Sequence, residues 1–355
     1  MSPWRRVLFA VLALGFASVL ALGLLEVAVR VLAPQPPSWF AIYAKHPGVP
    51  GLYHHIPGLA TWADTGETHY GVFTDERGHR IATPGARTPP PAQPDAPTVW
   101  FLGDSFTFGQ GASYEASFVG RIDAAAKGRL VVDNAGVGGW GPVHSLADFD
   151  YELARGKAPD LVVLSSFLGN DYYDSIWAKQ DVEVRDGILN DPGGLKSFLK
   201  RHTHTYRALA NLYHRYVGTR DVRTETAREM ARADDWQRTP LRDAESLYRD
   251  AMAGFARRAR THGIAFVVVL LPTREAVAEA AGAHTPGLDY ELVHRRTRAL
   301  LDGLGIEWID VLPRLAKLGP EASYLDFDGH FRDAANAEVA DAILEWIERR
   351  TKEGR

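Results

Sequence analysis

The stretch that decides the fold is Val-Trp-Phe-Leu-Gly-Asp-Ser-Phe-Thr-Phe-Gly, residues 99–109. It opens with four consecutive apolar residues, Val99–Leu102, as expected of a short strand that is buried on both faces. It then turns through Gly103-Asp104-Ser105 toward a helical pattern. A strand followed directly by a helix is typical of β-α-β units, so the stretch predicts an α/β fold with Ser105 at the carboxyl end of a strand.

Four further apolar runs follow along the chain and alternate with amphipathic stretches. They are Leu130–Asp133, Leu161–Phe167, Ile264–Leu271 and Ile306–Val311, and a last helix is expected over about Ala334–Arg350. Strands that alternate with helices predict a parallel sheet with helices on both faces. We therefore expect a three-layer α/β/α, flavodoxin-like sandwich with a five-stranded parallel sheet.

One connection between these runs is much longer than the others. Residues 168–263 number 96, more than 60 above any other crossover. The excess predicts a helical insertion at about residues 172–240. Because ligands in open α/β sheets bind outside the carboxyl ends of the strands, this insertion is placed to form a lid or a wall of the substrate site.

Composition excludes several classes of protein. The 355 residues include 40 Lys and Arg against 44 Asp and Glu, for a net charge of −4, so a basic footprint for nucleic acid is missing. The chain has no cysteine, which excludes disulfides, zinc–thiolate sites, iron–sulfur clusters and a thiol nucleophile.

The N-terminus predicts a membrane anchor over residues 1–32. Arg5 and Arg6 precede Val7–Leu25, an uncharged run of 19 residues. As a helix this run would span about 28 Å, close to the roughly 30 Å of a bilayer's hydrocarbon core. The alternatives are a signal peptide cleaved near Ala21-Leu22-Gly23 and a buried helix of a soluble protein.

The two arginines favour a cytoplasmic N-terminus by the positive-inside rule. We therefore expect a single-pass protein of the cell inner membrane with its catalytic domain in the periplasm. Residues 33–97 show no sustained period, and six prolines lie between residues 83 and 98. This composition predicts an irregular extension with a Pro-rich linker, followed by a main domain over residues 98–350.

Polar segments follow the predicted strands at the point where each strand ends. Besides Gly103-Asp104-Ser105 they are residues 134–141 (NAGVGGWG), residues 169–171 (GND) and residues 326–330 (DFDGH). Because the carboxyl ends of parallel strands meet at one edge of a sheet, we expect these four segments to converge. The G-x-G-x-x-G within residues 136–141 follows the second strand instead of the first, so a dinucleotide site is not expected.

These residue types suit acyl transfer through a serine. The Ser105 hydroxyl needs a base, for which His330 is the candidate, and that imidazole needs an orienting carboxylate such as Asp328. The oxyanion hole would use the N–H groups of Ser105 and Gly139 and the side-chain amide of Asn170.

In their order, the blocks GDSFTFG, NAGVGGWG, GND and DGH resemble those of the SGNH hydrolases, also called GDSL-like esterases, over about residues 98–350. The resemblance implies Ser105 as nucleophile, His330 as base, Gly139 and Asn170 as oxyanion-hole residues, and no metal or organic cofactor. The basic stub, the single apolar helix and the hydrolase domain behind it are similar to bacterial membrane-anchored members.

One position departs from the commonest pattern of that family, which has Asp three residues before the histidine. Phe327 stands there, and Asp328 and Asp326 lie two and four residues before His330. The two-residue spacing is similar to that of some envelope members, including polysaccharide O-acetyl-modifying proteins. Asp328 is therefore the expected orienting residue, with Asp326 as the alternative.

The expected function is that of an SGNH-type serine esterase. It would remove or transfer an ester-linked acyl group, with O-acetyl as the expected group, on an acylated small molecule or glycan outside the cytoplasm. The alternative is a non-catalytic, membrane-anchored module that binds a glycan or a partner in the cell envelope.

Overall fold

Five parallel strands form the centre of the computed structural model, in the order β7-β6-β8-β11-β12. The structure describes residues 2–35, 41–65, 67–85, 93, 95–178, 182–190, 193–216 and 222–353. The strands are β6 (Thr98–Leu102), β7 (Val131–Asn134), β8 (Leu161–Phe167), β11 (Ala265–Leu271) and β12 (Glu307–Asp310). Each expected apolar run forms one of them, with ends that agree within one residue, so the predicted parallel sheet is confirmed.

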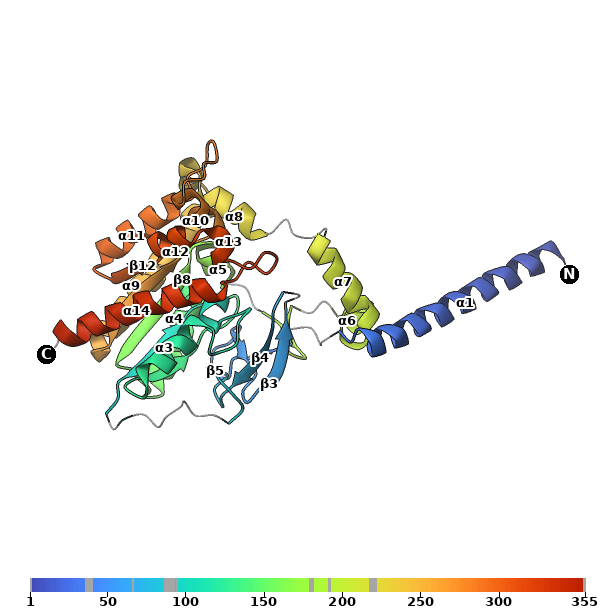
Figure 1. Ribbon diagram of the computed structural model, residues 1–355, viewed down its shortest axis with the longest axis horizontal. Coiled ribbons are helices and arrows are strands. Elements are labelled where there is room, and N and C mark those ends of the chain that lie inside the picture. The colour runs from blue at the N-terminus through green and yellow to red at the C-terminus, as the bar shows by residue number, and fades with distance from the viewer. Residues whose placement is uncertain are drawn as a thin grey trace.

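Side chains on these strands alternate between two apolar cores, one on each face of the sheet. On β6, Val99 and Phe101 belong to the first core, and Trp100 and Leu102 belong to the second. The first core is covered by α3 (Phe118–Ala126), α10 (Arg274–Ala280), α12 (Leu312–Leu318) and α14 (Asp333–Glu353), with α13 (Pro320–Ser323) adjoining. The second is covered by α4 (Pro142–Ala154), α9 (Leu241–His262) and α11 (Leu292–Leu304). The three-layer architecture is thus as expected (Figure 1).

The sheet is larger than expected, because the N-terminal extension adds strands to it. The added strands are β3 (Ala60–Asp64), β4 (His69–Thr74) and β5 (Arg80–Ile81), which give a mixed sheet of eight strands. They pair antiparallel, and β5 joins the edge of the parallel core at β7. The expectation of only five strands, all parallel, is therefore wrong.

The expectation of an irregular extension over residues 33–97 is wrong as well. Besides β3–β5, it forms a hairpin of β1 (Tyr43–Lys45) and β2 (Tyr53–His55). On β4 the buried residues Tyr70, Val72 and Thr74 alternate with less buried ones, so a period of two is present but short. Much of the Pro-rich linker, residues 86–92 and 94, lies outside the described residues.

The long connection between β8 and β11 carries several short helices. They are α5 (Asp171–Trp177), α6 (Gly194–His202), α7 (His204–Tyr216), α8 (Val222–Met230) and the 3₁₀ turn η1 (Ala233–Gln237), together with the small hairpin of β9 (Val184–Arg185) and β10 (Ile188–Leu189). The pair α6–α7 lies apart from the sheet, beside one end of α1 (Figure 1).

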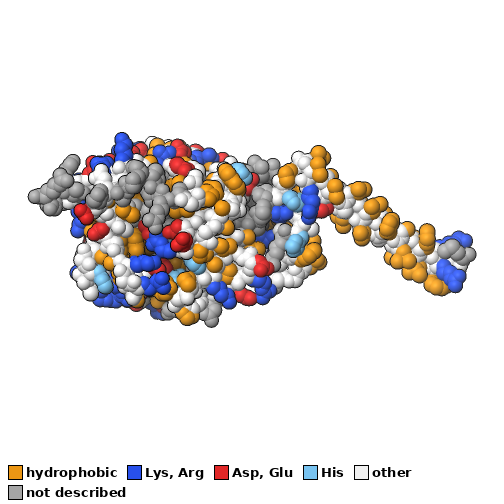
Figure 2. All heavy atoms as spheres, turned by 90° about the horizontal axis from the view of Figure 1, so that it is seen from below, with side chains coloured by type: hydrophobic (Ala, Val, Ile, Leu, Met, Phe, Trp, Pro, Cys, Tyr) orange, Lys and Arg blue, Asp and Glu red, His pale blue; other side chains and the backbone are white. Residues whose placement is uncertain are grey.

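Helix α1 (Pro3–Leu32) projects away from the rest of the molecule. Its most apolar 18-residue window has a mean hydropathy of 2.6, and no part of that window is buried. Figure 2 shows apolar side chains along its length and basic side chains at its free end. By length and composition, α1 can cross a membrane.

Candidate active site

The turn after β6 places Ser105 at the start of the short helix α2 (Ser105–Phe108). Asp104 is the N-cap of this helix, and its side chain accepts a hydrogen bond from the N–H of Phe106 at 2.8 Å. The cap favours a helix only two residues after β6 ends, because it satisfies an N–H that the first turn leaves without a partner. Ser105 is 8% exposed, so its hydroxyl lies in a largely enclosed site.

His330 links this serine to a carboxylate. Its Nε2 lies 2.7 Å from Oγ of Ser105, and its Nδ1 lies 3.0 Å from Oδ1 of Asp328. An ionised carboxylate can only accept, so Nδ1 carries the proton and Nε2 is left to accept the proton of the serine hydroxyl. The structure therefore brings together the predicted nucleophile, base and orienting residue in the arrangement of a catalytic triad.

The structure also separates the two candidate carboxylates. Asp326 is 52% exposed and pairs with Arg332 at 3.1 Å, whereas Asp328 is 7% exposed and faces His330. Gln110 donates from Nε2 to Oδ1 of Asp328 at 3.2 Å and so helps to hold this carboxylate. Asp328 has the geometry of the orienting residue, and Asp326 does not.

The segment of residues 135–141, here called the glycine loop, passes beside Ser105. A Cβ added at Gly138 would lie 2.6 Å from Oη of Tyr43 and 3.9 Å from Cβ of Ser105, so only glycine allows this close approach. Gly139 has a φ of +81°, in the region that favours glycine. Among the described residues, no protein acceptor is found for the N–H of Ser105 or Gly139, which leaves both able to bind an oxyanion.

Asn170 stands at the carboxyl end of β8, as the N-cap residue of α5. Its Nδ2 donates to Oδ2 of Asp174 at 2.7 Å, which orients the amide and leaves its second N–H available. The glycine loop packs against the same helix, since a Cβ at Gly141 would lie 2.9 Å from Cβ of Asp174. Asp174 thus contacts both the segment of residues 134–141 and the segment of residues 169–171.

Next to the motif residues lie three buried carboxyl groups that interact electrostatically, those of Asp104, Asp171 and Asp174. Burial, together with the charges of Asp104 and Asp174, raises the pKa of Asp171 well above its ordinary value. The neutral form of Asp171 is therefore favoured, which limits repulsion among the three groups.

Glu67 is a residue of this site that the sequence analysis missed. It comes from the turn between β3 and β4, and its carboxylate accepts from the N–H groups of Asp326, Phe327 and Asp328 at 2.8, 2.7 and 2.8 Å. Three charge-assisted hydrogen bonds therefore hold the segment that carries the orienting carboxylate. Nothing in the spacing or composition around Glu67 distinguishes it from an ordinary polar turn residue.

Two further residues of the extension hold loops of the site. Tyr53 donates from Oη to the carbonyl of Gly138 at 3.0 Å. Arg80, 1% exposed, donates to the carbonyls of Gly109 and Ala112, both at 2.6 Å. The backbone that follows α2 and leads to Gln110 is therefore tied to β5.

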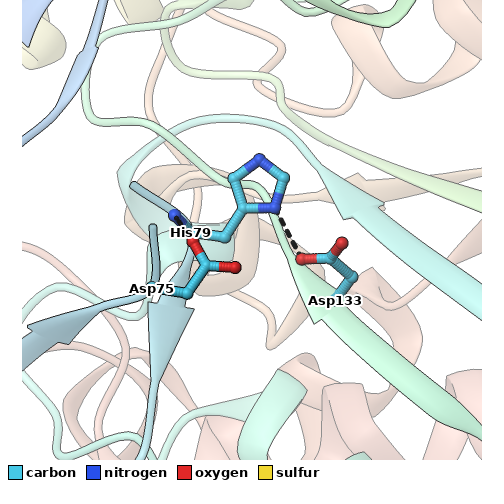
Figure 3. Close-up of side chains that lie close together, drawn as sticks. All are labelled: Asp75, His79 and Asp133. Carbon is cyan, nitrogen blue, oxygen red and sulfur yellow. Dashed lines mark hydrogen bonds and ion pairs between the residues drawn. The ribbon is translucent and has the colours of Figure 1, made fainter. Parts of the chain in front are cut away.

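Asp75, His79 and Asp133 form a cluster whose spacing could suit a metal ion (Figure 3). Asp75 Oδ1 already accepts from the N–H groups of Arg77 and His79, and Asp133 accepts from His79 Nδ1 at 2.6 Å. The Arg77 guanidinium lies 2.6 Å from the other oxygen of Asp133 and supplies the positive charge there. Because these atoms are already paired with N–H groups and with a guanidinium, they do not fit a metal site. The cluster instead holds the turn before β5 against β7.

No family model matches the chain, and no curated relative matches it either. Several solved structures are similar to it. The acetyl xylan esterase AlAXEase is 17% identical, with 70% of this chain and 99% of that chain covered and a TM-score of 0.40. The psychrotrophic esterase EstA from Pseudoalteromonas sp. is 11% identical, with 72% and 98% covered and a TM-score of 0.39. A member of the lipolytic protein G-D-S-L family from Veillonella parvula DSM 2008 is 14% identical, with 70% and 96% covered and a TM-score of 0.36.

Two of these solved structures are esterases, and the third is a member of the lipolytic protein G-D-S-L family. With TM-scores of 0.40 and below, the similarity carries no argument about substrate or mechanism. Those conclusions rest on the geometry of the site.

Proposed function

We propose that the chain is a serine esterase of SGNH type. The observation that carries this proposal is the chain of hydrogen bonds from Ser105 Oγ through His330 to Asp328, at 2.7 and 3.0 Å. A serine hydroxyl is a weak nucleophile by itself, and an adjacent imidazole oriented by a carboxylate is what makes it reactive.

The reaction proceeds in two halves. In the first, Ser105 Oγ attacks the carbonyl carbon of an ester while His330 Nε2 takes the hydroxyl proton. The N–H groups of Ser105 and Gly139 and the amide of Asn170 stabilise the oxyanion. The intermediate collapses as the C–O bond of the ester breaks, and His330 returns the proton to the departing alcohol.

The second half releases the acyl group. His330 takes a proton from water, the resulting hydroxide attacks the acyl-serine, and the free acid departs as Ser105 regains its proton. An acceptor hydroxyl in place of water would give acyl transfer with the same residues. Each half needs only groups of this chain and the substrates, so no cofactor takes part.

The second part of the proposal concerns the cellular location of the protein and its substrate. We propose that α1 anchors the protein in the inner membrane with residues 33–355 in the periplasm, which the apolar run and the two preceding arginines support. An O-acetylated glycan is the proposed substrate, supported by the two-residue spacing of Asp328 and His330 and by that location.

Full-length protein in detergent, incubated with an aryl acetate and with a fluorophosphonate probe, tests the proposal. We expect ester hydrolysis and labelling at Ser105, with both lost in Ser105→Ala and hydrolysis lost in His330→Ala. Ser113→Ala, in the loop after α2, is the matched control and should keep both. A folded protein that neither hydrolyses the ester nor reacts with the probe would favour the non-catalytic binding module.

Acetylated glycans, with and without a deacetylated acceptor, then separate the finer alternatives. Release of acetate in water alone indicates an esterase. Acetate found on the acceptor indicates a transferase.

A further inference from the structure

The end of α1 is joined to the helix pair α6–α7, here called the helical hairpin (residues 194–216). Glu26 accepts from the backbone N–H groups of His204 and Thr205, both at 2.8 Å, and so supplies the cap at the start of α7. Arg30 bridges the same elements: its Nε donates to Glu26 at 2.7 Å, and its Nη2 donates to the carbonyl of His202. The hairpin is therefore held at one defined level of α1.

That level is the end of the apolar run. The uncharged stretch of α1 ends at Leu25, directly before Glu26. If this run fills the hydrocarbon core, Glu26 lies at the outer boundary of the bilayer, and the start of α7 lies there with it. In Figure 1, α7 runs across the axis of α1 instead of along it, which is the direction of the membrane surface.

The hairpin exposes large apolar side chains. On α7, Leu209, Leu212 and Tyr213 are 61%, 51% and 58% exposed, and their i, i+3, i+4 spacing places them on one face. On α6, Leu195 and Phe198 are 72% and 56% exposed at a spacing of i, i+3. Exposed apolar surface of this extent on two short helices indicates that lipid or another protein surface covers it.

The charge of the hairpin indicates what that cover is. Residues 194–216 contain five Lys and Arg and no Asp or Glu, although acidic residues outnumber basic ones in the whole chain. Apolar faces combined with a purely basic charge are typical of helices that lie in the interface of a bilayer and attract anionic lipid.

We propose that the helical hairpin lies in the headgroup region of the bilayer that α1 spans, with its exposed apolar side chains among the lipids. The proposal rests on the membrane anchorage proposed above for α1. Continuity with α1 through Glu26 and Arg30 favours lipid over a second copy of the chain or a soluble partner, because any cover must fit beside the spanning helix. The hairpin gives the catalytic domain a second contact with the membrane, at a fixed distance from the anchor.

The absence of cysteine makes the test direct, since a single introduced cysteine is a unique labelling site. Leu212→Cys reports on the hairpin, Leu20→Cys on the anchor, and Arg242→Cys, whose side chain is 64% exposed at the start of α9, on the aqueous side. Each full-length variant is labelled with bimane and reconstituted into vesicles of phosphatidylcholine and phosphatidylglycerol. Quenching is then measured with lipids brominated near the headgroup, with lipids brominated deep in the acyl chain, and with aqueous iodide. Circular dichroism of each variant checks the fold.

We expect the label at position 212 to be quenched mainly by the shallow bromolipid, the label at position 20 by the deep bromolipid, and the label at position 242 by iodide alone. Leu195→Cys, on α6, should repeat the result of Leu212→Cys and replaces it should that variant fail to fold.

Two other results would overturn the proposal in distinguishable ways. If position 20 is quenched from the deep lipid but position 212 by iodide only, or by neither agent, the anchor stands and the hairpin is in water or covered by protein. If position 20 is not quenched by lipid, the anchorage itself fails, and the hairpin proposal fails with it. Neither result bears on the esterase activity, which is measured separately.

Discussion

The parallel core and the N-terminal extension contribute to the site in different ways. The core, residues 98–353, supplies every group proposed to react, and each one follows a strand or precedes a helix. The extension, residues 41–85, supplies no reacting group, yet Tyr53, Glu67 and Arg80 hold three separate loops of the site. The reacting groups lie at the strand ends because the topology of the sheet brings these ends together. The loops that carry them are positioned by contacts with residues that are distant in sequence. The four predictions that follow test this division, from the largest expected effect to the smallest.

Asp328→Asn should lower kcat by about 10³- to 10⁴-fold in hydrolysis of an aryl acetate. The amide can donate to Nδ1 of His330, which would put the proton on Nε2 and remove the base. Asp326→Asn is the matched control and should stay within about 2-fold, because Asp326 pairs with Arg332 and does not face the imidazole. Equal losses in the two variants would contradict the assignment of Asp328.

Asn170→Ala should lower kcat by about 10²-fold or more with little change in KM, since an oxyanion donor acts on the transition state. Asp174→Ala removes the acceptor that orients Asn170 Nδ2 and should give a smaller loss in the same direction. A KM effect with unchanged kcat would instead indicate that Asn170 binds the ground state.

Glu67→Ala should lower kcat by about 10-fold, because three backbone N–H groups lose their acceptor and the segment with Asp328 is less well held. Glu67→Gln keeps one acceptor oxygen and should recover part of the activity. Glu76→Ala, on an exposed residue of the same extension, is the control. If Glu67→Ala changes the thermal midpoint but neither kcat nor its pH profile, Glu67 serves stability alone.

His79→Gln should leave kcat unchanged and lower the free energy of unfolding by about 1–2 kcal/mol near pH 5. Burial by itself lowers the pKa of His79, but the charge and hydrogen bond of Asp133 outweigh it and raise that pKa. Burial alone would raise the pKa of Asp133, but His79 and Arg77 lower it to about 2.

The pH dependence of this contribution follows from the two shifts. The His79 contribution is complete below its unfolded pKa of about 6.5 and is lost as the pH rises through its higher folded value. The Asp133 contribution is complete above about pH 4 and is lost as the pH falls toward 2. In urea unfolding, the free energies of unfolding of wild type and variant should therefore differ more at pH 5 than at pH 9. Equal differences at the two pH values would contradict a stabilising ion pair between His79 and Asp133.

The central strands β6, β8 and β11 were predictable because each is a largely apolar run that is mainly buried on both faces. The order of the four motif blocks was likewise enough to predict that Ser105 and His330 would meet, as they do. The choice between Asp328 and Asp326 was left open by spacing, and only the fold of the segment before α14 decided it.

The strands of the extension were not predictable in the same way. β4 has the alternation of a half-buried strand, but it is only six residues long and has Gly71 within it. β5 has two residues, too few for any period, and becomes a strand because the edge of β7 is available to pair with it. Strand pairing of this kind depends on a partner distant in sequence.

The sequence by itself determined the α/β class, the strand ends that carry the chemistry and the long apolar helix at the N-terminus, because local periodicity and the order of short motifs specify these features. Only the tertiary structure decided that the extension completes the sheet, that Glu67 holds the segment of the orienting carboxylate, and that Glu26 joins α1 to the helical hairpin. The added strands pair with an edge that is distant in sequence, and the two carboxylates accept from backbone N–H groups far away in the chain. Neither glutamate differs in sequence from an ordinary polar residue, and each acquires its role only through the backbone that the fold places beside it.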